Sequence, residues 1–315
     1  MHAIIVSAQG GPEVLEYVER PDPTPGDGEV VVDVSASGVN FIDIYHRSGA
    51  YPLRLPTPIG SEGAGTVSAV GAGVRDVAVG DTVAWASVLG SYAEKAVIPA
   101  DRVVPVPDGV PADVAAAAML QGMTAHYLTH STYQVKEGDQ VLVHAGAGGM
   151  GQLLIQLSKL RGAKVYTTVS TSEKEKLARE AGADEVLRYD DFAEALRNKI
   201  DVVYDGVGAT TFDGGLEALR PRGLMALYGA ASGPVPPVDP QALNKQGSLF
   251  LTRPTLVHYI AERAELLQRA SDLFGWISEG RLAINISRRY PLADARQAHE
   301  DLAGRRTTGK LLLIP

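Results

Sequence analysis

The sequence predicts an α/β protein in two parts, a β-rich part and a doubly wound parallel sheet. Short valine-rich runs separated by Gly, Pro and Asp turns fill about the first hundred residues, a pattern typical of β-strands. From Gln140 onward strands and helices alternate, which is the order that gives a parallel sheet. The length of 315 residues is long for a single hydrophobic core, so we expect two domains.

Each expected element has a local signal. The stretch 113–120 is rich in alanine, a strong helix former, and Gly182 follows a charged amphipathic stretch as a helix C-cap does. Gly71-Ala72-Gly73 leads into no helix, so we expect a turn there. We expect the C-terminal tail to fold back onto the N-terminal β part. The expected strands are 30–34, 65–70, 141–143, 164–169, 201–205, 224–228 and 310–314, and the expected helices are 113–120, 152–157, 172–181, 260–279 and 293–302.

Composition narrows the classes of function. A formal net charge of −8 argues against nucleic acid or an anionic membrane surface as the main partner. No apolar stretch approaches the roughly 20 residues of a membrane span, and the N-terminus lacks the pattern of a signal peptide. We therefore expect a cytoplasmic protein without a membrane span. The absence of cysteine excludes disulfides, thiolate chemistry and zinc sites built with cysteine.

A glycine-rich loop gives the clearest functional signal. Gly146, Gly148 and Gly151 have the G-x-G-x-x-G spacing, between the expected strand 141–143 and the expected helix 152–157. This spacing allows a tight turn, exposes bare amides to a pyrophosphate and lets the helix pack close to the strand. The sequence therefore predicts a dinucleotide site. The alternative is a tight strand-to-helix turn in some other α/β domain.

The end of the second strand of this unit distinguishes the two nicotinamide cofactors. NAD-binding proteins place an acidic residue there to accept the ribose hydroxyls. Here Ser170, Thr171 and Lys174 occupy the region, and the end of the strand has no Asp or Glu before Glu173. A 2′-phosphate needs donors and positive charge, so we predict NADP(H). The alternative is that Lys174 only belongs to the solvated face of the next helix.

Several motifs together resemble one family. The segment 138–159 contains Gly138-Asp139-x-x-Leu142, the glycine loop and Gln156-x-x-Lys159. With them, the chain resembles the quinone oxidoreductase and ζ-crystallin group, in the zinc-free branch of the medium-chain dehydrogenase/reductase superfamily. Agreement extends along nearly the whole chain, in the segments 10–15, 38–43, 60–65, 246–249, 252–254 and 309–311.

The resemblance implies a GroES-like β-barrel domain and a Rossmann domain with a doubly wound parallel sheet. Residues 1–115, completed by 256–315, would form the catalytic β domain, and residues 116–255 would bind NADP. The active site would lie in the cleft between them. Relatives commonly form homodimers by pairing edge strands, and the apolar segment 248–251 is a candidate edge.

No metal is expected. Zinc-dependent relatives carry Cys and His where this chain has Asn40 and Ser61, and neither residue replaces those ligands well. His126 and His130 have a ligand spacing on an expected helix, but no acidic or thiol partner is near in sequence, so we expect both on a helix surface. Without a Lewis acid, hydride transfer favours an activated acceptor, a quinone or a conjugated carbonyl. The expected activity is NADPH-dependent quinone reduction. The alternatives are an enoyl or alkenal reductase and a crystallin-like or RNA-binding role.

The family comparison also implies the site residues. Tyr45 and Tyr51 would stack on a flat ring and donate a hydrogen bond, or else pack as half-buried tyrosines. Lys310 would reach the pyrophosphate or, alternatively, close the last strand. The residues implied in catalysis are Asn40, Asp43, Tyr45, Tyr51 and Gln121. The residues implied to bind the cofactor are Phe41, Ile42, Thr124, Gly146, Gly148, Gly149, Met150, Gly151, Ser170, Thr171, Lys174, Tyr189, Tyr228, Gly229, Ala230, Leu251, Thr252, Arg253 and Lys310.

Two departures from the family pattern are visible. The segment 197–201 is a shorter helix-to-strand connection than is usual, and we expect it to alter the surface rather than the chemistry. Gly206 replaces a side chain, commonly Ser, so no side-chain hydrogen bond is expected there.

Overall fold

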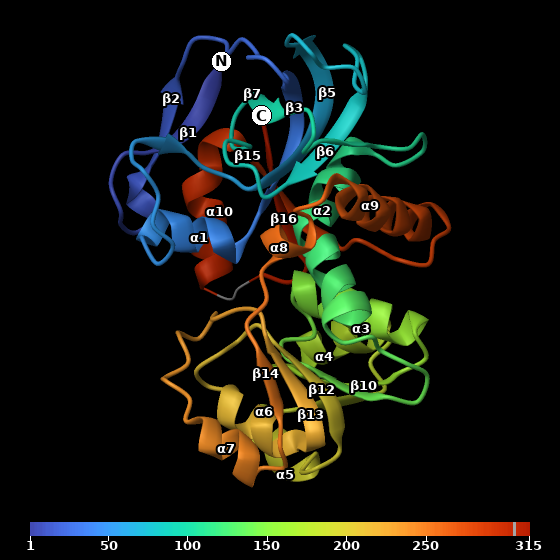
Figure 1. Cartoon of the computed structure of the whole chain (residues 1–315). Helices are drawn as coiled ribbons and strands as arrows, with labels where there is room; N and C mark the ends of the chain where they lie inside the picture. The colour runs from blue at the N-terminus through green and yellow to red at the C-terminus, as the bar shows by residue number, and fades with distance from the viewer. Residues whose placement is uncertain (305–306) are drawn as a thin grey trace. The chain divides into compact units, whose positions relative to one another are not determined.

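The chain folds into two compact units. One unit contains Met1–Met123 and Tyr259–Pro315, and the other contains Thr124–His258 (Figure 1). The structure, a computed structural model, describes residues 1–304 and 307–315. The predicted α/β class is confirmed, because the first unit has a largely antiparallel sheet and the second a parallel one. Among the residues that the structure describes, none of the helices combines the length and the hydropathy of a membrane span.

The first unit contains two sheets. The larger has the order β15-β16-β3-β5-β6-β8, with β7 also paired to β3, and the smaller has the order β2-β1-β4. The C-terminal strand runs antiparallel to β3, with Leu312 opposite Gly38, so the tail folds back onto the N-terminal β part as predicted. The strands are β1 His2–Val6, β2 Leu15–Glu19, β3 Glu29–Val39, β4 Thr57–Pro58, β5 Glu62–Val70, β6 Thr82–Ala86, β7 Lys95–Pro99, β8 Val104–Pro105, β15 Ile286–Pro291 and β16 Lys310–Ile314.

Helices and buried apolar side chains complete this unit. Trp85 packs with valines of β3, β5 and β6 in one cluster. Leu311 and Leu313 of the returning strand join Ile4 and Tyr92 in a second cluster, so the tail supplies part of the core. The helices are α1 Phe41–Ser48, α2 Ala112–Tyr127, α8 Leu256–Tyr259, α9 Arg263–Ser278 and α10 Ala295–Ala303, with α2 and α8 extending across the unit boundaries, and the short 3-10 turns are Pro12–Val14 and Leu292–Asp294.

The second unit is a six-stranded sheet in the order β11-β10-β9-β12-β13-β14, and all its pairs are parallel. The chain moves outward from β9 through β10 to β11 and then returns to β12 on the other side of β9. Ligands bind at such a reversal, beyond the carboxyl ends of the strands. The strands are β9 Gln140–Val143, β10 Lys164–Thr168, β11 Glu185–Leu187, β12 Ile200–Asp205, β13 Leu219–Leu227 and β14 Phe250–Thr252.

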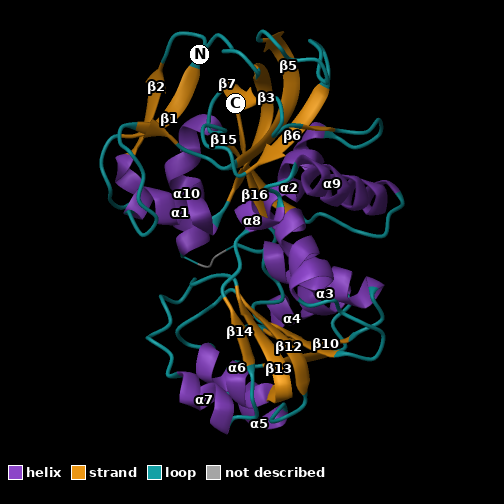
Figure 2. Cartoon of the chain, in the orientation of Figure 1, coloured by secondary structure: helices purple, strands orange, loops and turns teal. Residues whose placement is uncertain are grey.

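Helices flank this parallel sheet (Figure 2). Helix α3 packs against β9 and β10, and α6 packs against β12 and β13. These contacts bury Leu154 and Ile155 of α3 and Leu216 of α6. The helices of the unit are α3 Gly149–Leu160, α4 Ser172–Glu180, α5 Phe192–Ala195, α6 Phe212–Ala218 and α7 Pro240–Lys245, and a π-helical turn, Leu128–Thr132, follows α2.

The sequence predicted one helix over 260–279, and the predicted start of that helix is wrong. Helix α9 begins at Arg263, and the residues before it leave the helical conformation. The guanidinium of Arg269 donates to the Tyr259 carbonyl at 2.8 Å, and Arg102 donates to the Ile260 carbonyl at 2.8 Å. Arginine side chains thus satisfy carbonyls that helical amides would otherwise satisfy, and the contact from Arg102 comes from a distant part of the sequence.

Candidate functional site

The glycine loop lies at the carboxyl end of β9, where the sheet order reverses. Gly148 is the N-cap of α3, and Ala145 has a positive φ of 57°. A Cβ on Gly146 would collide with the hydroxyl of Thr167, and a Cβ on Gly151 would collide with the Ala145 carbonyl. Close approach of the backbone therefore requires glycine at both positions. The first amides of a helix have no acceptor within the helix, and binding of a pyrophosphate by those at the start of α3 stays a prediction.

Two threonines at the end of β10 brace this loop, and the sequence analysis missed them. The Thr168 hydroxyl accepts from the Ala145 amide at 3.3 Å and shares a 2.9 Å hydrogen bond with Nδ1 of His144. The Thr168 carbonyl accepts from the Gly146 amide at 3.1 Å. His144 is buried, and burial lowers its pKa, so the ring is neutral. The Thr167-Thr168 pair beside the glycine loop was the signal for this brace.

The predicted 2′-phosphate residues gather at the ends of β10 and β11. Lys174 Nζ donates to Ser170 Oγ at 3.4 Å, and the Lys174 amide donates to the N-cap hydroxyl of Thr171 at 3.2 Å. β10 and β11 pair in parallel, so Tyr189 follows β11 at the same edge of the sheet. Its ring lies 6.4 Å from the ring of His144. Hydroxyls and a cation suit a phosphate dianion.

The other predicted cofactor residues of this unit also follow strands at the carboxyl edge. Gly229 and Ala230 come after β13, while Leu251, Thr252 and Arg253 belong to β14 or follow it directly. The Tyr228 ring lies against Gly206, where an added Cβ would be 2.7 Å from three Tyr228 atoms. Gly206 therefore makes room for Tyr228, which is the physical reason for this departure from the family pattern. Thr124 is buried in α2, and Met150 lies in the first turn of α3.

In the first unit, Asn40 belongs to a buried polar network. Its Nδ2 donates to Glu62 Oε1 at 2.6 Å, and its Oδ1 accepts from Lys310 Nζ at 2.7 Å and from Gln121 Nε2 at 3.1 Å. Lys310 also pairs with Glu62, whose other oxygen accepts from the Leu120 amide at 2.6 Å. Glu62 is 0% exposed, Lys310 2% and Asn40 3%. The network fixes both ends of the Asn40 amide.

Two outcomes follow for the predicted residues in this network. Glu62 was not among them, although it lies in the segment 60–65 that resembles the family. Lys310 is the first residue of β16, and its buried ammonium is committed to Glu62 and Asn40. A contact of Lys310 with pyrophosphate stays a prediction that must compete with this internal pair.

Asp43 anchors a second buried network. Its carboxylate accepts from the backbone amide of Asn40 at 2.9 Å, from Ser61 Oγ at 2.7 Å and from the Tyr92 hydroxyl at 3.0 Å. The Tyr92 hydroxyl also bonds with His299 Nε2 at 3.2 Å. Because Tyr92 gives its proton to Asp43, the His299 nitrogen is the donor in that bond. Burial raises the pKa of Asp43 to about 6 and lowers the pKa of His299 to about 3. These contacts give Asp43 an anchoring role, and its predicted part in catalysis is untested.

Aromatic side chains of α1 and the following loop form a cluster. The rings of Tyr45 and Tyr51 lie 5.2 Å apart, and those of Phe41 and Tyr45 lie 6.3 Å apart. Tyr51 is 39% exposed, whereas Phe41, Ile42 and Tyr45 are half-buried. Such a partly exposed cluster can stack on a flat ring, and the tyrosine hydroxyl supplies a hydrogen-bond donor.

The histidine pair differs from expectation. His126 and His130 stack with their ring centroids 4.5 Å apart, but His126 is only 5% exposed. The expected helix-surface position is therefore wrong for His126, because α2 is apolar on most of its faces and is buried. Across the described parts of the chain, no group of three or more His, Cys, Asp or Glu residues has the arrangement of a metal site.

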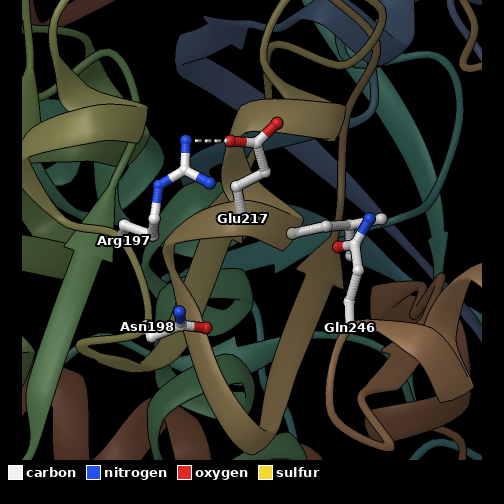
Figure 3. Close-up of a pocket in the computed structure, with 5 residues that line it drawn as sticks. Arg197, Asn198, Glu217 and Gln246 are labelled. Atoms are coloured by element: carbon white, nitrogen blue, oxygen red, sulfur yellow. Dashed lines mark ion pairs between the residues drawn. The ribbon is translucent and has the colours of Figure 1, made fainter.

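A shallow pocket of about 250 Å³ lies elsewhere in the second unit (Figure 3). Arg197 and Glu217 point toward one another across it and form an ion pair at 3.1 Å. Arg197 and Asn198 precede β12, whereas the glycine loop follows β9, and these strands are parallel. The pocket therefore lies at the opposite edge of the sheet from the glycine loop, and its one cation–carboxylate pair is internally neutralised. Its lining residues are Arg197, Asn198, Leu216, Glu217 and Gln246.

Fold and site together define a class. A parallel sheet with the order found here, a glycine loop at its reversal and phosphate-type donors beside it are the features of a dinucleotide-binding dehydrogenase or reductase. Residues 26–108 match the family model of the alcohol dehydrogenase GroES-like domain, and residues 181–313 match a model described as zinc-binding dehydrogenase. A quinone oxidoreductase of Pseudomonas aeruginosa is 45% identical, with 98% of each chain covered. The chain belongs to the quinone oxidoreductase family of the medium-chain dehydrogenase/reductase superfamily, which confirms the resemblance seen in the motifs.

Solved structures agree with this assignment. A mycobacterial protein complexed with NADPH has a TM-score of 0.98 and 52% identity, with both chains covered completely. The quinone oxidoreductase of Escherichia coli complexed with NADPH has a TM-score of 0.98 and 42% identity, again over all of both chains. The donor set at Asn40 and Ser61 still differs from that of the zinc enzymes that name one of the family models.

Proposed function

We propose that the protein is an NADPH-dependent quinone oxidoreductase that reduces quinones by hydride transfer without a metal. The observation that carries the proposal is the glycine loop at the sheet reversal, beside strand ends that present hydroxyls and Lys174. That arrangement fits a dinucleotide with a 2′-phosphate. The quinone oxidoreductases that are similar over the whole chain support the acceptor.

The chain's own residues divide the work. NADPH, when bound, supplies the hydride. The amides at the start of α3 would hold the pyrophosphate, and the Thr168 brace keeps the loop in the required conformation. Lys174 and Ser170 would receive the 2′-phosphate. In this proposal, these residues bind and orient the cofactor and take no part in bond making or breaking.

On the acceptor side, the aromatic cluster of α1 would orient the flat ring. The Tyr51 hydroxyl would donate to the quinone oxygen that gains negative charge as hydride arrives. Asn40 has both ends of its amide engaged, so in this proposal it acts by holding Gln121 in place rather than by binding substrate freely. A quinone gains aromaticity on reduction and needs less electrophilic help than an ordinary ketone.

Steady-state assays test this activity. NADPH oxidation is measured with 1,4-benzoquinone and with 2-alkenals, and each acceptor is repeated with NADH. We expect the highest kcat/KM for NADPH with the quinone. A faster rate with alkenals would replace the proposal by the enone reductase alternative, and equal rates with NADH would contradict the cofactor preference. Asn40→Ala should lower kcat/KM for the quinone, and unchanged kcat and KM would remove Asn40 from the site.

We further propose that the enzyme is a homodimer that pairs the edge strands β14. Phe250 on this strand is 60% exposed, and β14 has a strand on only one side within the described sheet. An exposed apolar edge is a template for pairing with a second copy. Phe250→Lys should shift the sedimentation coefficient toward that of a monomer. A wild type that sediments as a monomer at micromolar concentration would contradict the dimer.

Location, domain limits and partners complete the proposal. We place the protein in the cytoplasm, because its reductant NADPH is an intracellular cofactor, and cell fractionation tests this. We assign the catalytic β domain to 1–115 with 256–315 and the NADP-binding domain to 116–255. The compact units change nearby, at Met123/Thr124 and His258/Tyr259. The acidic composition argues against nucleic acid as a partner, and tight, salt-sensitive RNA binding would contradict that.

A further inference from the structure

We propose that Arg188, directly after β11, is a second cation for the 2′-phosphate of NADP(H) and determines specificity together with Lys174. This inference rests on the proposed function and deepens it, because it concerns the cofactor of the same site. The motifs that revealed the cofactor site did not point to Arg188. Its position, its hydrogen bonds and one unsatisfied nitrogen carry the argument.

The position follows from the register of two parallel strands. Thr168 of β10 is opposite Leu187 of β11, and the Val169 amide donates to the Leu187 carbonyl at 3.1 Å. The residues that leave the two strands therefore emerge at the same edge of the sheet. Ser170 leaves β10 there, and Arg188 leaves β11.

The hydrogen bonds place two cations around one short run of hydroxyls. Lys174 Nζ bonds to Ser170 Oγ at 3.4 Å, and Arg188 Nη2 bonds to Ser172 Oγ at 3.3 Å. Thr171 lies between these serines in the sequence. The bond from Arg188 is long, so the guanidinium gives up little when a stronger acceptor arrives. A phosphate dianion is such an acceptor, and it binds guanidinium in a planar, bidentate manner.

The unsatisfied nitrogen is Nη1 of Arg188. It is buried and has no hydrogen-bond partner among the residues that the structure describes. A buried charged N–H without an acceptor has lost its hydration and gained no hydrogen bond in return, which is unfavourable. A small rotation of the guanidinium that brought Nη1 and Nη2 onto phosphate oxygens would remove that cost on binding.

The neighbouring carboxylate does not satisfy the guanidinium. Glu175 Oε2 lies 3.4 Å from Arg188 Nη2, and both side chains are about one-third exposed, so the pair is weak. The other oxygen of Glu175 accepts two bonds from Arg179, at 3.0 and 2.8 Å. Arg179 thus takes most of the carboxylate, and Arg188 keeps its capacity for a ligand. Lys176 is a matched control, because this exposed cation lies on the same helix and pairs with Glu180 instead.

The test measures binding of 2′,5′-ADP and of 5′-AMP by isothermal titration calorimetry, which isolates the 2′-phosphate from catalysis. We expect Arg188→Gln to weaken 2′,5′-ADP binding at least about tenfold, which is the loss expected from one charge-assisted hydrogen bond. Binding of 5′-AMP should stay within about twofold of the wild type. Arg188→Lys should recover part of the loss. Lys176→Gln should change the binding of neither ligand, and an unchanged thermal midpoint confirms folding of each variant.

The outcomes separate the two proposals. If the wild type prefers 2′,5′-ADP and Arg188→Gln keeps that preference, the role of Arg188 is overturned and the proposed function stands. An equal loss for both ligands, or an equal loss in Lys176→Gln, overturns it as well. If the wild type binds both ligands alike, the cofactor preference itself fails, and the role of Arg188 fails with it.

Discussion

The buried network of the first unit and the strand-end cluster of the second unit are both polar, yet they are built differently. Asn40, Glu62 and Lys310 are at most 3% exposed, and the Asn40 bonds to the other two are 2.6 and 2.7 Å long. Lys174 and Arg188 are bonded to serines at 3.4 and 3.3 Å and remain partly open to solvent. Asn40, Glu62 and Lys310 satisfy one another without a ligand, whereas Arg188 of the second cluster keeps one nitrogen without an acceptor. We therefore expect the first to control stability and the second to control affinity.

Lys310→Met should produce the largest loss of stability. The substitution leaves the Glu62 carboxylate buried with its charge uncompensated, which costs about 3–5 kcal/mol of unfolding free energy. Urea unfolding followed by circular dichroism measures it. The double variant Lys310→Met/Glu62→Gln removes both charges and should recover part of the loss, so it remains informative if the single variant does not fold. A loss below about 1 kcal/mol in the single variant would refute the claim that this pair stabilises the unit.

The two regions also differ in how far the sequence predicted them. The strand-end cluster was predictable because its signals are local, since Ser170, Thr171 and Lys174 directly follow a strand at the distance a dinucleotide fold requires. The buried network was not, because Glu62 and Lys310 are 248 positions apart and no local pattern joins them. The same limit explains the start of α9, which a side chain from position 102 helps to set.

Arg188 lies in the strand-end cluster, but its place there was not predictable from local sequence signals. Its neighbour Tyr189 was implied by the family comparison, yet Arg188 looks like an ordinary surface arginine in the sequence. Only the register of β10 against β11 places it beside Ser170 and Ser172. Parallel pairing brings together residues that are close in neither sequence nor motif.

The second buried network of the first unit, around Asp43, should make the unfolding free energy depend on pH. The raised pKa of Asp43 gives stability that is present below its ordinary value of 3.8 and is lost as the pH rises through about 6. The pKa of His299, lowered by burial and by Arg47, gives stability that is present above 6.5 and is lost as the pH falls toward about 3. The two contributions oppose each other between pH 7 and 5. His299→Gln removes one, so lowering the pH from 7 to 5 should stabilise this variant relative to wild type by about 2 kcal/mol.

Unfolding free energies at pH 5, 6 and 7 measure this effect. Glutamine can still donate to the Tyr92 hydroxyl, so the hydrogen-bond chain to Asp43 is preserved in the variant. His2→Gln is the control, because that histidine is 41% exposed in its side chain and bonds to Glu94 instead. Parallel pH profiles for wild type and His299→Gln would show that His299 contributes nothing to the pH dependence.

Thr168→Val should combine a moderate loss of stability with a loss of affinity, because the brace lies between the core and the cofactor loop. Valine keeps the shape but leaves the Ala145 amide and His144 Nδ1 without the hydroxyl, at a cost of about 1–3 kcal/mol. We expect the Kd for NADPH, measured by cofactor fluorescence, to rise while the KM for the quinone changes little. Thr168→Ser restores the hydroxyl and should restore both quantities. Equal stability and affinity in Thr168→Val and wild type would rule out the brace.

Lys174→Gln is the opposite of Lys310→Met, and it should have the smallest effect on stability. Both substitutions remove a lysine ammonium that hydrogen-bonds to another side chain, but Lys174 is only partly buried and the Ser170 hydroxyl that it contacts carries no charge. No buried charge is left behind, so the unfolding free energy should change by less than about 0.5 kcal/mol. The Kd for NADPH should nevertheless rise about tenfold relative to that for NADH, since a charge-assisted phosphate bond is lost. A stability loss comparable to that of Lys310→Met would contradict the proposal that the buried network controls stability and the strand-end cluster controls cofactor affinity.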